Sequence, residues 1–349
     1  MPILHIRFVI QTHSMKKLLL LINFVSLSII GFSQPKQNDK IISIHLLNYT
    51  DDDALELLSS QLDGLQEVGI DHIFLEVDYH FEFTSHPELI NPTFITKVGA
   101  QKFAKDCKAH GINIIPQFQS LGHQSWAENT WELLTVYPEL DLTPGAFPNN
   151  KDIYCREWDP MNPRVNQIVF PMIEEILDAF DADGLHIGMD EVFLITSEFA
   201  TSTKDQNPAE VYAKVVNEFH DHFTKKLNKK LYMWGDRLID GTVYNYGEWE
   251  SSFNGTAPAI DFIPNDIVIC DWHYESMLSY ASVKLFIDKG FEVLPCSWKN
   301  SEAAEELIKY SYAFNEKKMV GHMFTTWGAV PDDSLLQFES MNKGIARIN

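Results

Sequence analysis

Residues 97–119 read KVGAQKFAKDCKAHGINIIPQFQ, and the fold is predicted from the unit that this stretch contains. Its first part, residues 97–110, has the apolar spacing of an amphipathic helix, and Gly111 follows where a helix C-cap is expected. Its second part, residues 113–119, is a short isoleucine-rich run that predicts a buried strand. The stretch therefore indicates a helix that leads into a strand.

The same alternation continues along the chain from residue 41. Eight short apolar runs are predicted as strands, at residues 41–47, 72–77, 113–119, 184–188, 231–234, 267–271, 292–295 and 319–325. Amphipathic stretches lie between them, at residues 53–68, 97–110, 163–180, 208–227, 276–289 and 301–316. Eight strands that alternate with helices predict an α/β fold, a single-domain (β/α)₈ TIM barrel. A doubly wound open sheet is the alternative, but no GxGxxG follows the first run and no phosphate-binding loop occurs.

The N-terminal segment is interpreted as an export signal. Lys16 and Lys17 precede an apolar run at residues 18–30, and small residues follow up to Ser33, which is the layout of a cleavable signal peptide at residues 15–33. Residues 1–14 are interpreted as an upstream extension from a misassigned start, 34–40 as a short linker and 41–349 as the barrel. The apolar run is shorter than the roughly 20 residues of a spanning helix, so no stable membrane insertion is expected. We expect an exported protein, periplasmic or secreted.

The charge balance and the cysteines exclude several kinds of partner. The chain has 49 acidic and 27 basic residues, a formal net charge of -22, which would repel polyphosphate, so no nucleic-acid partner is predicted. The cysteines show no CxxC spacing, and burial is expected for all four: Cys107, Cys155, Cys270 and Cys296. The histidine spacing predicts no metal site either, and no cofactor is expected.

Carboxylates and aromatic residues follow almost every predicted strand. The C-terminal strand ends of such a barrel carry its reactive residues, and here they bring Glu76, Asp78, His123, Asp190, Glu191, Trp234, Asp236, Trp272, Tyr274, Trp298 and Trp327. Acids among Trp and Tyr side chains suit a sugar, whose ring faces stack on aromatics while its hydroxyls form hydrogen bonds. Residues 119–162 and 235–265, rich in Trp, Tyr, Gly and Asn, are predicted as loops over this end.

Three short motifs carry a resemblance to a known family. Residues 185–191, LHIGMDE, resemble the HxGxDE motif of glycoside hydrolase family 20, the β-N-acetylhexosaminidases. Residues 115–123, IPQFQSLGH, resemble that family's third-strand segment, and residues 233–236, MWGD, resemble its fifth-strand Trp motif. Together with FLEVDY at residues 74–79 and FTTWG at residues 324–328, they look most like the single-domain branch that includes hexosaminidase D.

The resemblance implies an exo-acting enzyme that removes terminal GlcNAc or GalNAc from a glycan or a small-molecule glycoside. Family 20 enzymes retain configuration by substrate-assisted catalysis, in which the acetamido group of the substrate attacks the anomeric carbon. Glu191 would then be the general acid/base, Asp190 would orient the acetamido group, and Tyr274 would donate to its oxygen. The expected substrate-binding residues are His123 and His186 beside the acids, Glu76 and Asp78 on ring hydroxyls, Trp234, Trp272 and Trp327 around the acetamido methyl, and Asp236 and Trp298.

The chain departs from the family pattern in ways that leave alternatives open. It lacks the first-strand Arg and the Glu two residues after the last-strand Trp, so Glu76, Asp78 or Lys299 is expected to replace them. Met189 replaces the second glycine of the motif. One alternative is a barrel that binds aminosugars with little catalysis; the other is a retaining glycosidase with a conventional nucleophile at Glu76 or Asp236. The roles of four residues stay open: Trp126, Trp131, Trp158 and Trp249.

Overall fold

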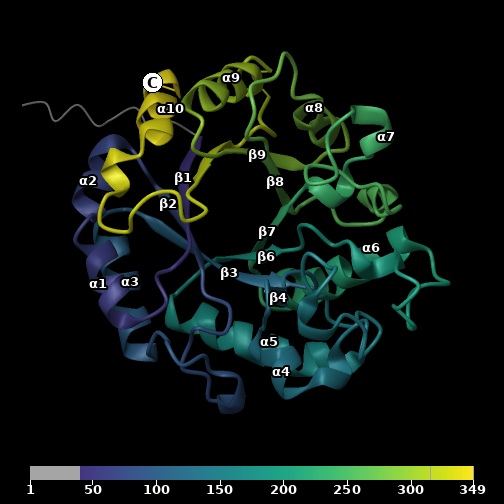
Figure 1. Ribbon diagram of the computed structural model, residues 1–349. Coiled ribbons are helices and arrows are strands. Elements are labelled where there is room, and N and C mark those ends of the chain that lie inside the picture. The colour runs from purple at the N-terminus through teal and green to yellow at the C-terminus, as the bar shows by residue number, and fades with distance from the viewer. Residues whose placement is uncertain (1–39, 315, 349) are drawn as a thin grey trace, which may run out of the picture. The chain divides into compact units, whose positions relative to one another are not determined.

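The computed structural model describes residues 40–314 and 316–348, and eight parallel strands form a closed barrel at its centre (Figure 1). The strands are β1 (Ile41–Leu46), β2 (His72–Glu76), β3 (Asn113–Ser120), β6 (Gly184–Gly188), β7 (Lys230–Trp234), β8 (Val268–Trp272), β9 (Glu292–Ser297) and β10 (Gly321–Thr325). They follow one another around the barrel in chain order, and β10 pairs with β1. The predicted TIM barrel is therefore confirmed, with strand ends that differ from the prediction by at most two residues.

The seam between β1 and β10 depends on a glycine. Ile41 is the register partner of Gly321, and a Cβ atom on Gly321 would lie 2.0 Å from the Ile41 carbonyl oxygen. Only a residue without a side chain lets the two strands approach closely enough to pair here. The last strand can thus close the sheet onto the first.

Helices surround the barrel in the order that the alternation predicts, with four differences. The main helices are α1 (Asp52–Ser59), α2 (Leu62–Val68), α3 (Lys97–Ala109), α5 (Pro163–Ala179), α6 (Pro208–Phe219), α8 (Ala281–Asp288), α9 (Ser301–Tyr312) and α10 (Glu339–Ile348). The helix expected at 53–68 is two helices, and the one expected at 208–227 ends as a π-helix over His220–Lys226. The helix expected at 276–289 begins only at Ala281, and α10 was not predicted.

The barrel interior is filled with side chains, because successive strand residues point alternately inward and outward. Phe74 of β2 packs inside the barrel against Tyr232 of β7, with 5.1 Å between ring centroids. The neighbours Ile73 and Leu75 belong to a separate, larger core that includes residues of the surrounding helices, such as Phe103. A filled interior leaves the ends of the barrel as the place for a site.

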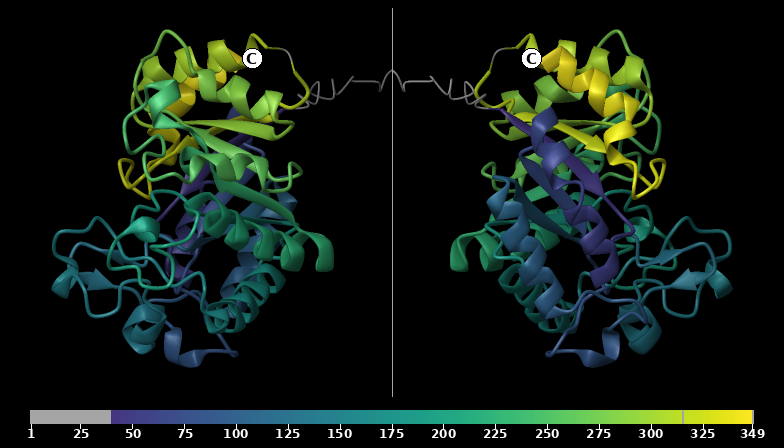
Figure 2. Two further views of the ribbon diagram at one scale, coloured as in Figure 1. Left: turned by 90° about the vertical axis from the view of Figure 1, so that its right-hand side faces the viewer. Right: turned by 90° about the vertical axis from the view of Figure 1, so that its left-hand side faces the viewer.

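Long connections lie at the C-terminal ends of the strands. The segment between β3 and α5 contains a hairpin of β4 (Ser125–Trp126) and β5 (Asn129–Thr130) and the short helix α4 (Glu132–Val136), and it projects beyond the barrel in Figure 2. The connection from β7 to β8 contains only α7 (Gly241–Tyr244) and 3₁₀ turns. These segments are the loops that the sequence predicted over this end.

Contacts group residues 40–349 into one compact unit, and the signal peptide predicted at residues 15–33 lies outside the described residues. No helix in the described part of the chain is both long and apolar enough to cross a membrane. All four cysteines are buried, as expected, and none of them forms a disulfide.

Candidate active site

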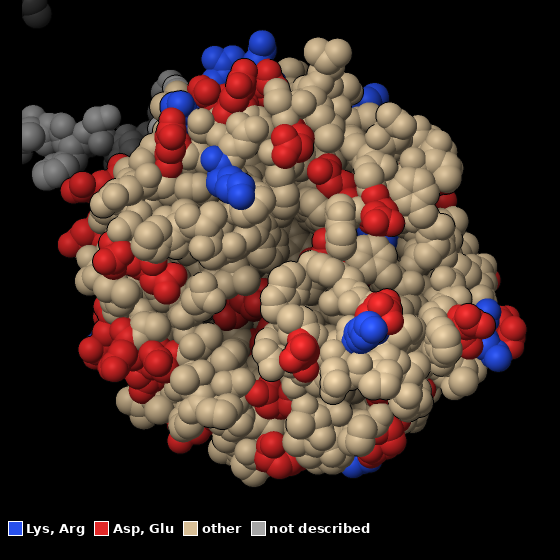
Figure 3. Space-filling model, viewed as in Figure 1, with Lys and Arg blue, Asp and Glu red and all other residues tan. Residues whose placement is uncertain are grey.

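A cavity of about 640 Å³ opens at the C-terminal end of the barrel strands. Nine of the twelve predicted site residues line it: Glu76, Asp78, His123, Asp190, Glu191, Trp272, Tyr274, Trp298 and Trp327. Figure 3 views this end of the molecule and shows a central hollow with acidic side chains inside it. The tertiary structure therefore brings together residues that follow or end six different strands.

The two adjacent acids share one histidine. Asp190 and Glu191 directly follow Met189, the residue after β6, and His123 comes from the connection after β3. The His123 Nε2 atom lies 3.1 Å from Glu191 Oε2 and 3.3 Å from Asp190 Oδ2, which are ion-pair distances although neither contact has the angle of a hydrogen bond. Gln119 donates a hydrogen bond to the other oxygen of Asp190. Both oxygens of Asp190 therefore face a positively polarised partner.

These contacts set the protonation states of Asp190 and His123. Burial alone would raise the pKa of Asp190, but the His123 charge and the Gln119 hydrogen bond hold it below its usual value. Burial likewise opposes charge on His123, yet the carboxylate of Asp190 raises the pKa of the imidazole well above its ordinary value. At neutral pH the structure thus contains an imidazolium beside an ionised Asp190.

Two further carboxyl groups that line the cavity have pKa values that are raised, whereas that of Asp190 is lowered. The Glu76 carboxylate accepts from Gln117 Nε2 at 2.8 Å, and the Asp78 carboxylate accepts from the backbone N–H of Gln119 at 2.6 Å. Burial raises the pKa of Asp78 to about 7, and burial together with the nearby Asp78 raises that of Glu76 well above its usual value. Protonated carboxyl groups can donate as well as accept, which suits the recognition of sugar hydroxyls.

Aromatic side chains form another wall of the cavity. The rings of Trp272 and Tyr274 stack at 4.9 Å with 26° between their planes, and Trp298 lies 5.5 Å from Tyr274. The Tyr274 hydroxyl oxygen accepts a hydrogen bond from Trp327 Nε1 at 2.6 Å. The hydroxyl keeps its own proton, so Tyr274 can donate to a group in the cavity.

Three predicted substrate-binding residues do not line the cavity. His186 and Trp234 point into the filled barrel interior, where both are fully buried and their rings lie 4.5 Å apart. His186 contacts neither acid; its Nδ1 accepts from the Gly188 N–H, and burial lowers its pKa well below the usual value. Asp236 is buried in an ion pair with Arg237. The prediction that these side chains reach the substrate is corrected: they lie behind the cavity wall, because position at a strand end does not decide which way a side chain points.

The long loops supply lining residues that the motifs did not identify. Tyr154, Trp126, Trp131 and Glu132 of the long connection after β3 line the cavity. Asn48, after β1, and Gln119, in β3, line it as well. Tyr154 packs against His123, with 5.6 Å between ring centroids. Of the other undecided tryptophans, Trp158 is core and Trp249 is 44% exposed beside Tyr154. Lys299 does not line the cavity; its ammonium lies 3.8 Å from the centroid of the Trp298 ring.

Steric constraints explain why a glycine occupies position 188 in the LHIGMDE motif. Gly188 has a φ of +65°, and a Cβ atom there would lie 2.1 Å from Gln119 Oε1. Any side chain would therefore displace the amide that donates to Asp190. Positive φ values also occur in non-glycine residues at the strand ends, at Asn48, Asp78, Leu121, His123, Met189, Glu191 and Trp327. Such strain is typical of sites that need side chains in a set arrangement.

Only one group of His, Asp and Glu side chains in the described part of the chain is close enough to hold a metal ion. It consists of His123, Asp190 and Glu191, whose ligand atoms lie within 4.8 Å of one another. A metal ion would have to displace the proton of the His123 imidazolium, because a metal ligand must be neutral imidazole. The same three groups can also carry out acid–base chemistry.

Two curated proteins are similar in sequence to this chain. A lacto-N-biosidase from Bifidobacterium bifidum is 24% identical over 193 residues, which is 51% of this chain and 16% of that protein. A β-hexosaminidase from Emericella nidulans is 20% identical over 285 residues, 70% of this chain and 40% of that protein. The chain thus spans less than half the length of these two curated relatives.

Solved structures share the fold. The chitobiase of Flavobacterium johnsoniae superposes with a TM-score of 0.62 at 16% identity, over 88% of this chain and 48% of that one. Dispersin B superposes with a TM-score of 0.58 at 17% identity, over 88% of this chain and 99% of that one. The model of glycosyl hydrolase family 20, catalytic domain, matches residues 39–330, and the chain therefore belongs to this family.

Proposed function

We propose that the protein removes terminal N-acetylhexosamine from β-glycosides with retention, by substrate-assisted catalysis through an oxazolinium intermediate. The observation that carries the proposal is the adjacent pair of acids in the cavity, with Asp190 held ionised by His123 and Gln119. An ionised carboxylate accepts the N–H of an acetamido group and stabilises the positive charge that develops on it. The fold of the relatives is consistent with this chemistry, and the site residues supply its groups.

Each group has one task in the proposed reaction. Glu191 donates its proton to the leaving oxygen while the acetamido oxygen attacks the anomeric carbon and the glycosidic bond breaks. Asp190 accepts the amide N–H, and the Tyr274 hydroxyl donates to the amide oxygen and so orients the nucleophile. Glu191, now a carboxylate, takes a proton from water, and that water opens the oxazolinium ring from the opposite face. Two inversions give net retention.

The cavity geometry favours an exo-acting enzyme with an N-acetylated substrate. The barrel interior beneath the cavity is filled by Phe74, Trp234 and Met323, so a sugar chain enters end first and stops. Trp272, Tyr274, Trp298 and Trp327 give apolar surface for the sugar ring and the acetamido methyl. Glu76 and Asp78 would bind ring hydroxyls in place of the missing first-strand Arg.

Neither Asp236 nor Glu76, the two candidates for a conventional carboxylate nucleophile, suits that role. Asp236 does not line the cavity, and its oxygens accept from Arg237 Nε, from the Glu191 N–H and, weakly at 3.4 Å, from Trp272 Nε1. Glu76 lines the cavity, but burial raises the pKa of its carboxyl group, which disfavours the ionised form that a nucleophile needs. The acetamido group is the nucleophile that remains.

The test uses aryl β-GlcNAc, β-GalNAc and β-glucoside with the wild type and with Glu191→Gln and Asp190→Asn. We expect hydrolysis of the N-acetylated sugars alone, a loss of about 10³-fold or more in both variants, and tight inhibition by a thiazoline mimic of the cyclised intermediate. Glu56→Gln, on the exposed face of α1, is the matched control and should retain activity. Equal cleavage of the plain glucoside contradicts the mechanism. Binding of aminosugars without any hydrolysis favours the alternative of a binding barrel.

We also propose that residues 15–33 direct export to the periplasm or the medium. Fractionation of cells that express the full chain, with sequencing of the mature N-terminus, tests this. A cleaved product that begins near residue 34 outside the cytoplasm is expected.

A further inference from the structure

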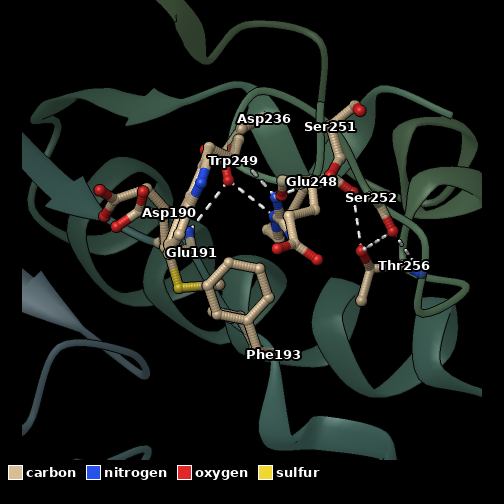
Figure 4. Close-up of polar contacts among 12 residues, drawn as sticks. Asp190, Glu191, Phe193, Asp236, Glu248, Trp249, Ser251, Ser252 and Thr256 are labelled. Atoms are coloured by element: carbon tan, nitrogen blue, oxygen red, sulfur yellow. Dashed lines mark hydrogen bonds and ion pairs between the residues drawn. The ribbon is translucent and has the colours of Figure 1, made fainter. Parts of the chain in front are cut away.

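A buried ion pair lies beside the two acids and takes no part in the mechanism above. Asp236 and Arg237 follow β7 and are 2% and 1% exposed. Arg237 Nε donates to Asp236 Oδ2 at 2.6 Å, and the same oxygen accepts the backbone N–H of Glu191 at 2.9 Å (Figure 4). The ion pair therefore contacts the main chain of the proposed general acid without touching the cavity.

The main chain of Glu191 needs such a restraint. Its φ is +50°, a region that residues with a side chain rarely adopt, so surrounding contacts must maintain it. Asp236 holds the first residue of the segment 191–194. Glu157, which is fully buried, accepts from the N–H groups of Phe193 at 2.6 Å and Leu194 at 2.5 Å and holds its other end. Two carboxylates from other parts of the chain thus set the path on which the acid lies.

Arg237 extends the contact to the loop between β7 and β8. Its Nη2 atom donates to the carbonyl oxygens of Glu248 at 2.6 Å, Trp249 at 3.0 Å and Ser251 at 2.8 Å. Its guanidinium also lies 4.8 Å from the centroid of the Phe193 ring. Figure 4 shows Phe193 and Trp249 on the side of this network that faces Glu191. One arginine thereby joins the loop to the segment of the acid.

The same loop reaches the cavity rim. The Trp249 ring packs on Phe193 at 5.5 Å and on Tyr154 at 4.8 Å, and Tyr154 lines the cavity. A shift of the loop would therefore move both the rim and the contacts that hold Glu191.

We propose that Asp236 and Arg237 are positioning residues: they hold Glu191 for proton transfer to the leaving oxygen and couple its position to the loop at residues 248–251. The inference rests on the proposed function, because it assigns the pair to the placement of that acid. Proton donation matters most when the leaving group is a poor one, since a weakly basic leaving group departs without it. Loss of positioning should therefore slow substrates with poor leaving groups selectively.

The experiment compares Asp236→Asn with the wild type on dinitrophenyl and phenyl N-acetylhexosaminides. An amide has one oxygen, so it cannot accept from Trp272 on one side and from Arg237 and Glu191 on the other. We expect kcat to fall by about 10²-fold or more with the phenyl glycoside and by less than about 10-fold with the dinitrophenyl glycoside. Arg237→Lys keeps the charge but loses the fork of hydrogen bonds. It should lower the ratio of kcat for the phenyl glycoside to kcat for the dinitrophenyl glycoside, as Asp236→Asn does.

Asp141→Asn is the matched control. Asp141 forms a buried ion pair with Arg156, whose Nη2 donates to the carbonyl oxygens of Ala146 and Phe147, yet the pair contacts no residue of the segment 189–194. This variant should lose stability but leave the ratio of the two substrates unchanged.

The outcomes separate the inference from the function on which it rests. An equal loss on both substrates in a folded Asp236→Asn or Arg237→Lys variant overturns the positioning role. Should Asp236→Asn not fold, the ratio in Arg237→Lys decides. A wild type that cleaves neither N-acetylhexosaminide contradicts the proposed function itself, whereas a cleaving wild type with an unchanged ratio contradicts only the positioning role.

Discussion

Replacing His123 by Asn should move the acidic limb of the pH–activity profile to higher pH. The imidazolium of His123 holds the pKa of Asp190 below its usual value, and the proposed mechanism requires Asp190 as a carboxylate. Without that charge the pKa of Asp190 rises, so the carboxylate is protonated, and activity is lost, at a higher pH than in the wild type. Asn suits the position because His123 has a φ of +53°, a conformation that Asn tolerates better than most residues.

The distance gives the size of the effect. Unit charges 3.3 Å apart attract by about 5 kcal/mol at an effective dielectric constant of about 20, equivalent to at most about 3.7 pKa units. Water in the open cavity weakens the attraction, so we expect a rise of about one to three units. Each unit lowers kcat/KM about tenfold at a pH below both pKa values.

The assay is kcat/KM for an aryl N-acetylhexosaminide from about pH 2.5 to about pH 9 for the wild type and His123→Asn, so that the range includes the wild-type acidic limb, which lies below the usual pKa of an Asp side chain. His72→Asn, at the opposite end of β2, is the control, because its imidazole pairs with Asp71 and lies outside the cavity. Its acidic limb should coincide with that of the wild type. An unchanged acidic limb in His123→Asn would refute the assignment of His123 as the group that keeps Asp190 ionised.

Three further predictions concern packing, stability and substrate charge. Gly188→Ala should reduce kcat/KM about 10- to 100-fold with a folded circular-dichroism spectrum, because its Cβ displaces Gln119 from Asp190; full activity contradicts this. Burial raises the pKa of Asp78 to about 7, so the folded protein keeps a proton that the unfolded chain loses near pH 4. The resulting contribution to the free energy of unfolding is complete below about pH 4 and is lost as the pH rises through 7. Chemical unfolding of Asp78→Asn and the wild type tests this. The free energy of unfolding of the variant, relative to that of the wild type, should increase by about 1–3 kcal/mol between pH 5 and 8. A difference that does not change with pH would contradict the raised pKa. A 6-sulfated aryl N-acetylglucosaminide should be cleaved at least about tenfold more slowly than the unsulfated one, with equal rates as the contrary result, because no Lys or Arg of the described chain lines the cavity to pair with the sulfate, whereas acidic side chains such as Glu132 do line it.

The barrel and the position of the two adjacent acids in the cavity were predictable from local sequence. The strand alternation is visible because a parallel barrel strand is buried on both faces and reads as a short apolar run, as in residues 113–119. The position of Asp190 and Glu191 after a strand then places them at the C-terminal end of the barrel. Nine of the twelve predicted site residues line the cavity for the same reason.

The errors concern the direction of side chains. Trp234 ends β7 and was expected to contact substrate, but it points into the barrel and packs with Trp327 at 5.5 Å from within. Asp236 lies two residues further and is turned to Arg237. Both residues lie at or just after the end of β7, where the sequence places them near the cavity. The local path of the backbone directs both side chains away from it.

The sequence by itself therefore determined the fold class, the family and the two acids, since each depends on patterns within a short stretch of chain. The tertiary structure alone decided which side chains surround those acids: Tyr154 and Trp126 come from a loop, and His123 reaches Asp190 across 67 positions of sequence. It also decided the charges, because the pKa of Asp78 and that of Asp190 move in opposite directions although both carboxyl groups line one cavity. Burial and neighbouring charge set a pKa, and both arise only when distant segments pack together.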